Sequence, residues 1–534
     1  MSAPRSVRFR LALESFRENL GLVLRTWSGK IGIALLIIQL ILALYALAAY
    51  FPTGTASAYM GSTDWVYYYP RAAPPCWATH EKVSFFKVTQ DDFALLGTNV
   101  TKKTITVGFG VAAYSVYTIK TDREAQFTYT SKVYPQDLRI LVDLDIRETM
   151  NLSNVKARVP PKLKLEIEVE RPDGLRVLLF NGSIPRKLYN SEILLAGANE
   201  SGKLLPVRLN ELGEQVSSAI RIDPNLIAKS LQSILDNFNE SIAKSLKKRP
   251  AHLLMTKVGP NGAPEVLTGT YKIRIHVVEV MDGAYYEKGY RINVTLKKFL
   301  LEPVANCYGL LGTDDKARPI GLGLLLGLPY AFLLGFIVTF SSTFIGAIYG
   351  TFAGYWKDYR GEALMRVADV FLSLPFLPIL IALSYVFKGS INLWMLSFLM
   401  IVLFWAGPVI VVRSMALQIS EQPYVEAAKA VGASTWRIVF RHVFPQIFPY
   451  TLAIAVLSIP GIIIAEASLA LLGLGDPVAP TWGKMLQEAY NAQAVQNGLW
   501  WLYLFPGFAL VVFSATFLLI GRAIEPLVAP KLQR

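Results

Sequence analysis

Long runs without a charged side chain constrain the fold of this chain more than any other feature. The first run, from Ile31 to Phe51, contains twenty-one residues and no charge, which is long enough to cross the hydrocarbon core of a bilayer once as a helix. The chain is 53% hydrophobic over 534 residues, with a mean hydropathy of +0.38. These values exceed those of a soluble globular domain and fall short of a protein embedded throughout its length. We therefore expect a membrane protein with a sizeable soluble part.

Five further apolar runs are predicted to span the membrane in the C-terminal part of the chain. They cover residues 330–349, 367–387, 393–412, 448–472 and 500–520. Pro329 is predicted to separate the first of them from an outer interfacial helix, because proline interrupts the helical hydrogen-bond pattern. Six spans with both termini cytoplasmic place the basic residues of the connections on the inner side. This topology accounts for the net charge of +14, and no basic-aromatic motif indicates nucleic acid.

Residues 1–30 precede the first span and combine basic side chains with apolar ones at helical spacing. This pattern predicts an amphipathic helix that lies on the cytoplasmic leaflet. The sequence AAYFPTG after the first run is a poor cleavage site for a signal peptidase, so residues 31–51 are expected to remain as the first span.

Between residues 52 and 316 the pattern changes from apolar runs to alternation. Segments at 102–120, 139–146, 162–170, 271–280 and 290–298 are rich in Val, Ile, Thr and Tyr at a period of two. This is the pattern of strands with one buried face. A helical pattern interrupts the strands at residues 224–248. We therefore predict an inserted β-rich, sandwich-like domain with a hydrophobic core of its own.

The inserted domain is predicted to lie outside the cell, because the first span would deliver it there. All acceptor sequences for N-glycosylation fall within it, at Asn99, Asn151, Asn181, Asn199, Asn239 and Asn293. Both cysteines, Cys76 and Cys307, lie near its two ends. A disulfide between them would stabilise the domain by on the order of 5 kcal/mol. Two separate buried thiols are the alternative.

A polar stretch from Glu421 to Pro445 separates two of the predicted spans. Pro423 suits the first turn of a helix, Gly432 suits its end, and Ser434 suits the cap of a second helix. We therefore predict two short helices joined at a glycine bend, which is more structure than a reversal of the chain requires. An ordinary helical hairpin on the inner membrane face is the alternative.

This stretch resembles the cytoplasmic loop of ABC-importer permeases, in which Glu-Ala-Ala is followed at fixed spacing by Gly and by Ile-x-Leu-Pro. The matching positions hold Glu426, Ala427, Ala428, Gly432 and Pro445, whereas His442 and Phe444 replace the usual Ile and Leu. Further similar runs are LGTDD at 311–315, AGYW at 353–356 and AEASLALLGLG at 465–475. They resemble the second-type subunit of the dipeptide/oligopeptide/nickel group. Ala317 and Pro319 depart from its Gly-Arg-Asp element.

The resemblance implies that the first span and residues 317–534, with five spans, form a permease subunit and not an enzyme. Such a subunit would import peptides by alternating access, with oligosaccharides or nickel as alternative cargoes. The implied partners are a second permease subunit, two cytoplasmic ATPases, an extracellular substrate-binding protein and membrane lipid. The ATPases would bind ATP and Mg²⁺, and this chain itself is expected to hold no cofactor. Coupling to the ATPases is assigned to Glu421, Tyr424, Glu426, Ala427, Ala428, Gly432 and Arg437.

Glu466 is a charged residue inside the predicted span 448–472, near its outer end. Burying an acid there costs roughly 3 kcal/mol on insertion scales, so its side chain should face protein or water. Glu466 would line the translocation path or its outer gate, or it would be a structural carboxylate bonded to a neighbouring helix. Asp369 is instead predicted to pair locally with Arg366.

No catalytic, metal or nucleotide site is predicted in the chain. GANESGK at 197–203 has the spacing of a phosphate loop but lacks the Ser or Thr that would bind Mg²⁺ and the helix that would hold phosphate. Four histidines and two cysteines are spread too widely for a metal cluster. The inserted domain would dock the binding protein or cover the outer mouth, or would only stabilise the protein and carry glycans. A surface receptor or adhesion protein anchored by its spans is the alternative from another functional class.

Overall fold

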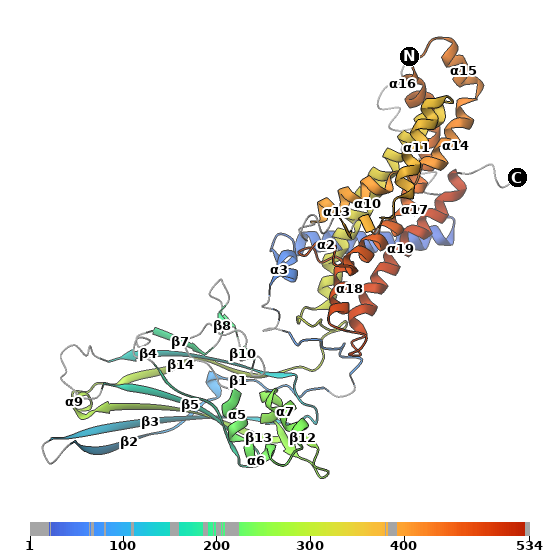
Figure 1. The fold of residues 1–534 in the computed structure, drawn as a ribbon. Helices are drawn as coiled ribbons and strands as arrows, with labels where there is room; N and C mark the ends of the chain where they lie inside the picture. The colour runs from blue at the N-terminus through green and yellow to red at the C-terminus, as the bar shows by residue number, and fades with distance from the viewer. Residues whose placement is uncertain are drawn as a thin grey trace. The chain divides into compact units, whose positions relative to one another are not determined.

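The computed structural model describes residues 21, 23–62, 65, 69–79, 82–107, 112–149, 160–184, 191–195, 197–198, 204–205, 207–208, 224–376, 378–379, 381–382 and 392–528. The chain forms two compact units, Met1–Ser62 with Arg318–Arg534, and Thr63–Ala317. The first unit is helical and the second is rich in strands (Figure 1). The amphipathic helix predicted over residues 1–30 lies largely outside the described residues.

The described elements of the helical unit run along the chain in the order that follows. They are α2 (Trp27–Ala49), α3 (Thr55–Gly61), α10 (Ile320–Tyr355), α11 (Tyr359–Ser373), α13 (Leu393–Phe404), α14 (Val409–Ser420), α15 (Pro423–Ala430), α16 (Thr435–Ile438), the π-helical turn η5 (Val439–Val443), α17 (Phe444–Leu471), α18 (Trp482–Asn491) and α19 (Trp501–Val528).

Four helical stretches of the described chain are long and apolar enough to cross a membrane. They are Trp27–Ala49, Ile320–Tyr355, Thr435–Leu471 and Trp501–Ile524. The pair α13 and α14 would make a fifth, bent by 49° at its break. The sixth predicted span, 367–387, is described only in part, because residues 383–391 lie outside the described chain.

The predicted break at Pro329 is wrong. The helix α10 is 36 residues long and continues through this proline. The indole nitrogen of Trp482, at the start of α18, donates to the Leu324 carbonyl at 3.0 Å, one turn before the proline. The carbonyl that Pro329 leaves without its helical amide is that of Leu325, the residue next to Leu324. Membrane helices tolerate a proline where neighbouring helices and local adjustments satisfy the freed backbone groups.

The connection between the second and third predicted spans contains the polar start of α11. Asp358 caps this helix by accepting a hydrogen bond from the Arg360 amide at 3.0 Å. The predicted local pair is confirmed, since Arg366 lies 3.6 Å from Asp369. Arg366 also bonds Glu362 at 2.8 Å, so two acids share one guanidinium on the exposed face of α11.

Helices α10 and α14 approach one another along a row of glycines, Gly346, Gly350 and Gly354. A Cβ atom on these residues would lie 2.1, 2.8 and 2.5 Å from the carbonyl oxygens of Trp405, Val409 and Arg413. Small residues at a spacing of four allow backbones to touch, which is a common way for membrane helices to pack. This contact holds α10 against the segment formed by the end of α13 and by α14.

The β-rich unit contains two five-stranded antiparallel sheets, two small two-stranded sheets and a group of short helices (Figure 1). Its strands are β1 (Val88–Thr89), β2 (Ala94–Val107), β3 (Ala112–Tyr129), β4 (Asp137–Glu148), β5 (Lys162–Glu170), β6 (Arg176–Ile184), β7 (Ser191–Leu195), β8 (Gly197–Ala198), β9 (Leu204–Leu205), β10 (Val207–Arg208), β11 (Thr256–Val258), β12 (Pro264–Val266), β13 (Gly269–Asp282) and β14 (Ile292–Val304). Its helices are η1 (Gln90–Asp92), α5 (Pro224–Ser230), α6 (Gln232–Leu235), α7 (Glu240–Lys247), α8 (Pro250–Leu254) and α9 (Gly283–Glu287).

One five-stranded sheet has the strand order β2-β3-β13-β5-β6, and the other has β1-β14-β4-β10 with β7 also paired to β4. The two-stranded sheets pair β8 with β9 and β11 with β12. The inner faces of the five-stranded sheets share one hydrophobic core with the helices. In β5 every second side chain is buried, from Leu163 to Val169, as the alternating sequence predicts. The core is filled by large side chains such as Tyr129, Tyr271 and Phe299.

Two predictions for this unit need correction. Residues 102–120 are a hairpin and not one strand, because β2 ends at Val107 and β3 begins at Ala112. The helix predicted over 224–248 is broken into α5, α6 and α7. Asn239 causes the last break, since its side chain accepts from the Ile242 amide at 2.9 Å and starts a new helix there.

Candidate functional site

The polar stretch between the spans begins with the helix α15. Gln422 is its extended N-cap and Pro423 stands in its first turn, where a missing amide breaks no helical bond. The helix ends at Gly432, whose φ is +79°. The Gly432 amide donates to the Lys429 carbonyl at 2.9 Å and the Ala433 amide to the Ala428 carbonyl at 3.1 Å. These two bonds form a Schellman cap, which requires the left-handed conformation that glycine adopts without strain.

The second helix of the predicted pair is not a separate short element. Ser434 is the extended N-cap of α16, which then passes through the π-helical turn η5 into α17. Thr435–Leu471 is one helical stretch of 37 residues. Pro445 lies in the first turn of α17, beside this wider turn, where its missing amide is accommodated.

One side chain of α15 fastens the loop to the helices. Val425 is fully buried and belongs to a cluster with Val412 of α14, Ala347 of α10 and Ile447 of α17. Ala428 is partly buried against the same cluster. The helices α10, α14 and α17 therefore meet at the root of this loop.

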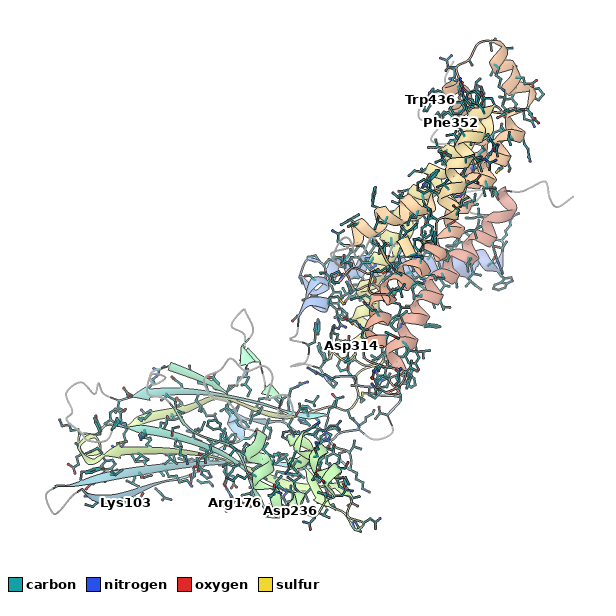
Figure 2. All side chains as sticks on the ribbon, in the orientation of Figure 1. Lys103, Arg176, Asp236, Asp314, Phe352 and Trp436 are labelled. Carbon is teal, nitrogen blue, oxygen red and sulfur yellow. A yellow bond between two sulfur atoms is a disulfide. The ribbon has the colours of Figure 1, made fainter. Side chains whose placement is uncertain are left out.

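The tip of the loop is exposed. The residues further on that are buried again are Ile438, Val439 and Val443. Val431 is 85% exposed and Trp436 is 65% exposed. Trp436 stacks on Phe440 at 5.3 Å and contacts Phe352 edge-on at 5.0 Å between ring centroids. Figure 2 shows Phe352 and Trp436 together at one end of the helical unit. An exposed apolar patch of this kind is suited to contact with another protein or with lipid.

Of the residues assigned to coupling from the sequence, most lie on this exposed part. Those with exposed side chains are Glu421, Tyr424, Glu426, Ala427 and Arg437, while Ala428 is half-buried and Gly432 forms the bend. The sequence analysis missed Val425 as the buried anchor and Val431 as the most exposed apolar residue. A valine two positions before Ala427 was the available signal for the anchor, because it lies on the helix face opposite Glu426 and Ala427.

Polar contacts tie the two ends of the loop to its neighbours. Lys357 donates to Glu421 at 2.7 Å, and this bond lowers the pKa of the Glu421 carboxyl. The Lys429 ammonium lies 5.1 Å above the ring of Tyr355. Gln446 donates to the Tyr424 hydroxyl at 2.7 Å. Exposed contacts of this kind contribute little stability and set the position of the loop.

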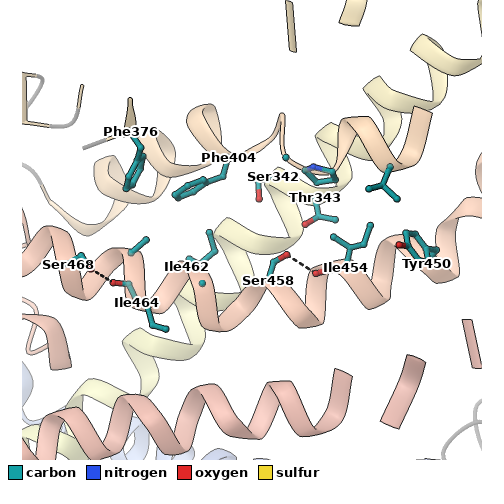
Figure 3. A pocket seen from close by; sticks show the side chains of 15 residues that line it. Ser342, Thr343, Phe376, Phe404, Tyr450, Ile454, Ser458, Ile462, Ile464 and Ser468 are labelled. Carbon is teal, nitrogen blue, oxygen red and sulfur yellow. Dashed lines mark hydrogen bonds between the residues drawn. The ribbon is translucent and has the colours of Figure 1, made fainter. Parts of the chain in front are cut away.

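A cavity of about 700 Å³ lies between α10, the α13–α14 bend and α17 (Figure 3). Its lining residues are Ser342, Thr343, Phe376, Phe404, Gly407, Pro408, Val411, Tyr450, Ile454, Ser458, Gly461, Ile462, Ile464, Ala465 and Ser468. The break at Gly407 and Pro408 forms part of its wall. None of these lining side chains is charged, so the cavity surface is apolar with a few hydroxyl groups.

The hydroxyl groups of the cavity are mainly acceptors. Ser458 donates to the Ile454 carbonyl and Ser468 to the Ile464 carbonyl, both at 2.8 Å (Figure 3). Their protons are thus used inside α17, and the oxygen lone pairs remain available to a guest molecule. A site of this kind accepts hydrogen bonds from amide groups and packs against apolar side chains, with little preference for charge.

Glu466 has a buried carboxylate. Its side chain is 3% exposed, and its Oε1 accepts a hydrogen bond from the Thr481 hydroxyl at 2.7 Å. Thr481 is the N-cap of α18. The lining of the cavity includes its neighbours Ala465 and Ser468 but not Glu466 itself. The carboxylate is bonded to a neighbouring helix, as the structural alternative expects, and the assignment of Glu466 to the path or its outer gate stays a prediction.

A buried ion pair fastens α18 on its other side, and the sequence analysis missed it. Arg318 donates to Glu488 of α18, and its guanidinium lies 5.2 Å above the ring of Tyr59 in α3. Both charged side chains are buried. Their separation in the sequence left no local signal of the pairing. Together with Glu466 and Thr481, this pair fixes α18 against α17 and against the start of α10.

In the β-rich unit, Cys76 and Cys307 form a disulfide that closes a separation of 231 residues. Of the six acceptor asparagines, the four within the described residues are Asn99, Asn181, Asn239 and Asn293, and all four are exposed. Asn151 and Asn199 lie outside the described residues. Among the described residues, no group of three His, Cys, Asp or Glu side chains is placed to hold a metal ion.

Comparison with known proteins assigns the C-terminal part of the chain. Residues 346–533 match the family described as "Binding-protein-dependent transport system inner membrane component". The chain is 30% identical over 231 residues to the oligopeptide transport system permease protein OppC of Haemophilus influenzae, covering 43% of this chain and 72% of that protein. It is 30% identical over 240 residues to the probable D,D-dipeptide transport system permease protein DdpC of Escherichia coli, covering 45% and 78%. It is 27% identical over 270 residues to the dipeptide transport system permease protein DppC of Bacillus subtilis, covering 50% and 82%.

Among solved structures, the chain is similar to the MetNI methionine ABC transporter in inward-facing conformations. The identity is 20%, the TM-score is 0.31, and the similarity covers 40% of this chain and 98% of that one. A score that low adds nothing to the sequence comparison. The sequence matches, the apolar helices and the Glu-Ala-Ala loop agree with one another, and the chain belongs to the family of binding-protein-dependent transport system inner membrane components, as an ABC importer permease of the peptide group.

Proposed function

We propose that this chain is a permease subunit of an ATP-driven importer that takes up peptides or similar oligomeric solutes by alternating access. Its partners are a second permease subunit, two cytoplasmic ATPases that bind ATP and Mg²⁺, and an extracellular substrate-binding protein. The exposed part of the loop 421–445 carries this proposal. It presents Val431 and Trp436 to a partner, while Val425 connects the loop to three long helices.

The cavity supports a peptide cargo over nickel. A divalent metal ion prefers imidazole, thiolate or carboxylate ligands, and the lining of the cavity contains none of them. Hydroxyl acceptors on apolar walls suit the amide hydrogens and mixed side chains of peptides. Oligosaccharides remain an alternative cargo of the same transporter class, because hydroxyl groups bind them as well.

We assign both termini to the cytoplasm and residues 52–316 to the outside of the cell. The orientation follows from the basic residues around the predicted inner connections. The inserted domain is proposed to dock or orient the substrate-binding protein. Deleting it should lower uptake of substrate at limiting concentrations of the binding protein. Unchanged uptake after the deletion would refute this role.

A charge at the tip of the loop tests the coupling role directly. Val431→Glu should reduce the amount of ATPase that purifies with the membrane subunits by about tenfold, because a buried interface residue typically contributes 1–2 kcal/mol or more. The matched control is Val495→Glu. Val495 is 71% exposed and follows α18, away from the loop. Normal ATPase binding by Val431→Glu, with uptake intact, would contradict the coupling role of the loop tip. Absence of any ATPase from the membrane subunits purified with the natural chain would favour an anchored surface receptor.

A further inference from the structure

The two five-stranded sheets of the β-rich unit end on strands that have an open edge. The sheet β2-β3-β13-β5-β6 ends on β2 and on β6, and no other described strand pairs with their outer edges. In the second sheet, β14 pairs with β4 along most of its length, but β1 covers only Leu300 and Leu301 on its other side. An open edge exposes unpaired amide and carbonyl groups that another chain can pair with.

Each of these three open stretches carries one exposed glycosylation acceptor. Asn99 lies on β2, Asn181 on β6 and Asn293 on β14. All three begin an Asn-x-Ser/Thr sequence. The interior strands β3, β4, β5 and β13 contain no asparagine at all. The strand-borne acceptors among the described residues are thus confined to edges.

The same three strands also carry irregular pairing. The register shifts between Leu95 and Gly97 in β2 and between Leu296 and Lys298 in β14. A third shift lies in the pairing of β5 with β6, at Ile167 and Glu168. The long pairings of β13 with β3 and with β5 are regular. A bulge bends an edge away from flat pairing and is one way in which natural sheets avoid edge-to-edge association.

Basic side chains stand on these edges as well. Lys102 and Lys103 follow Asn99 on β2, and Lys297 and Lys298 follow Asn293 on β14. Arg176 begins β6; Figure 2 shows Lys103 and Arg176 on their strands. Charges on an edge oppose the approach of a second strand. An acceptor asparagine, an irregular pairing register and at least one basic side chain therefore occur together on each of β2, β6 and β14.

On β6, Asn181 lies beyond the part of the strand edge that the helix α5 covers. The Leu178 amide donates to the Ser230 hydroxyl of α5 at 3.3 Å, so a helix covers the first half of this strand. Asn181 lies three residues further on, beyond this bond. Asn181 thus lies on a stretch of β6 whose outer edge pairs with no other described strand.

We propose that Asn99, Asn181 and Asn293 are N-glycosylated, and that their glycans block strand addition at the open edges of the two sheets. In the modification, the Asn side-chain nitrogen forms a bond with the anomeric carbon of an oligosaccharide. The bond from that carbon to the phosphate of a lipid-linked donor breaks, the lipid phosphate leaves, and the amide loses one proton. The blocked partner is a strand of a second copy of this chain. The inference rests on the extracellular assignment made under the proposed function.

The fourth described acceptor provides an internal control. Asn239 caps α7 through its side-chain oxygen and lies on no sheet edge. A glycan at this position would leave the edges unchanged. Its loss should therefore not alter association between copies, whether or not Asn239 is modified.

The test uses the full chain purified from the cells that naturally make it. Mass spectrometry of glycopeptides should find an oligosaccharide on all three asparagines. Light scattering in detergent should then find about a threefold larger share of dimers and larger species in the variant Asn99→Gln, Asn181→Gln, Asn293→Gln, because open edges associate. Thr101→Ser, Ser183→Thr and Thr295→Ser preserve the acceptor sequences and should behave as the unmodified protein does. So should Asn239→Gln.

The outcomes separate this inference from the function on which it rests. Unmodified asparagines in a domain that external protease can reach would overturn the glycosylation. Modified asparagines whose removal leaves the share of oligomers unchanged would overturn the edge-blocking role. A domain that external protease cannot reach in intact cells would overturn the extracellular assignment itself, and with it this inference.

Discussion

The helical unit contains a close contact between backbones that the described core of the β-rich unit does not use. In the helical unit, α10 meets α14 along Gly346, Gly350 and Gly354, so that backbone touches backbone. In the β-rich unit, the core is filled by residues such as Tyr271 and Phe299. Burial of large apolar side chains stabilises a domain in water, but it gives no such gain between helices that lipid already surrounds. The helical unit should therefore be sensitive to added side-chain volume, and the β-rich unit to the loss of the disulfide that joins its two ends.

The two units also differ in how far along the chain their contacts reach. The β-rich unit joins Cys76 to Cys307, so its two ends are held by one covalent bond. The helical unit is held by helices whose backbone bonds are local. Three changes test this difference, from the largest expected effect to the smallest.

Removing the disulfide should give the largest effect and should be confined to the β-rich unit. Cys76→Ala with Cys307→Ala is expected to lower the free energy of unfolding of this unit by about 5 kcal/mol, because the bond closes a very long loop in the unfolded chain. Hydrogen exchange on the full chain would measure it, through faster exchange in β4 and β14. Equal acceleration in α10 would contradict the independence of the two units.

Adding volume between α10 and α14 should damage the helical unit selectively. Gly346→Leu places side-chain atoms against the Trp405 carbonyl and is expected to cost about 3 kcal/mol, as overpacking does. Uptake and thermal stability of the purified complex would measure the loss. The control is Gly507→Leu in α19, where a Cβ atom has open space. Similar losses in both variants would show that helix propensity, and not the close approach, decides the result.

Acid should weaken the β-rich unit by a smaller amount. Burial alone would raise the pKa of Glu124, but hydrogen bonds from Arg274 and Gln126 and the charge of Arg274 outweigh it, so the net shift of the pKa is downward. A carboxyl with a lowered pKa stabilises the folded state above its unfolded value, and this contribution disappears as the pH falls through the folded pKa. Denaturant unfolding of the β-rich unit should therefore become easier below about pH 4.5.

The variant Glu124→Gln provides the control for this pH dependence. It should be less stable at neutral pH and should lose less stability on acidification. An acid response as steep as that of the natural chain would assign the effect to other carboxyl groups.

Local sequence rules predicted the first helix of the loop Glu421–Pro445 and its glycine bend, but not the continuous helix that follows Ser434. Pro423, Gly432 and Ser434 each occupy the backbone position that their chemistry favours. These residues decide their own conformation within a few neighbours, so one sequence suffices to place them. The alternation of β5 was predicted for the same reason.

Contacts between residues far apart in the sequence could not be predicted from local sequence rules. Pro329 was expected to end a helix, and the indole of Trp482 instead donates to a carbonyl one turn earlier. No sequence signal indicated that the Thr481 hydroxyl donates to Glu466. The pair of Arg318 with Glu488 spans most of the helical unit in sequence. In each case the deciding group lies on an element whose position the sequence does not give.

The burial of Val425 has a consequence for how motion would enter the membrane part. This side chain sits in one close-packed cluster with residues of α10, α14 and α17. Close-packed interiors resist gradual deformation and shift as a body. A displacement of α15 would therefore be transmitted to α10, α14 and α17 at the same time. The packing of Val425 would set how much these helices move for a given displacement of α15.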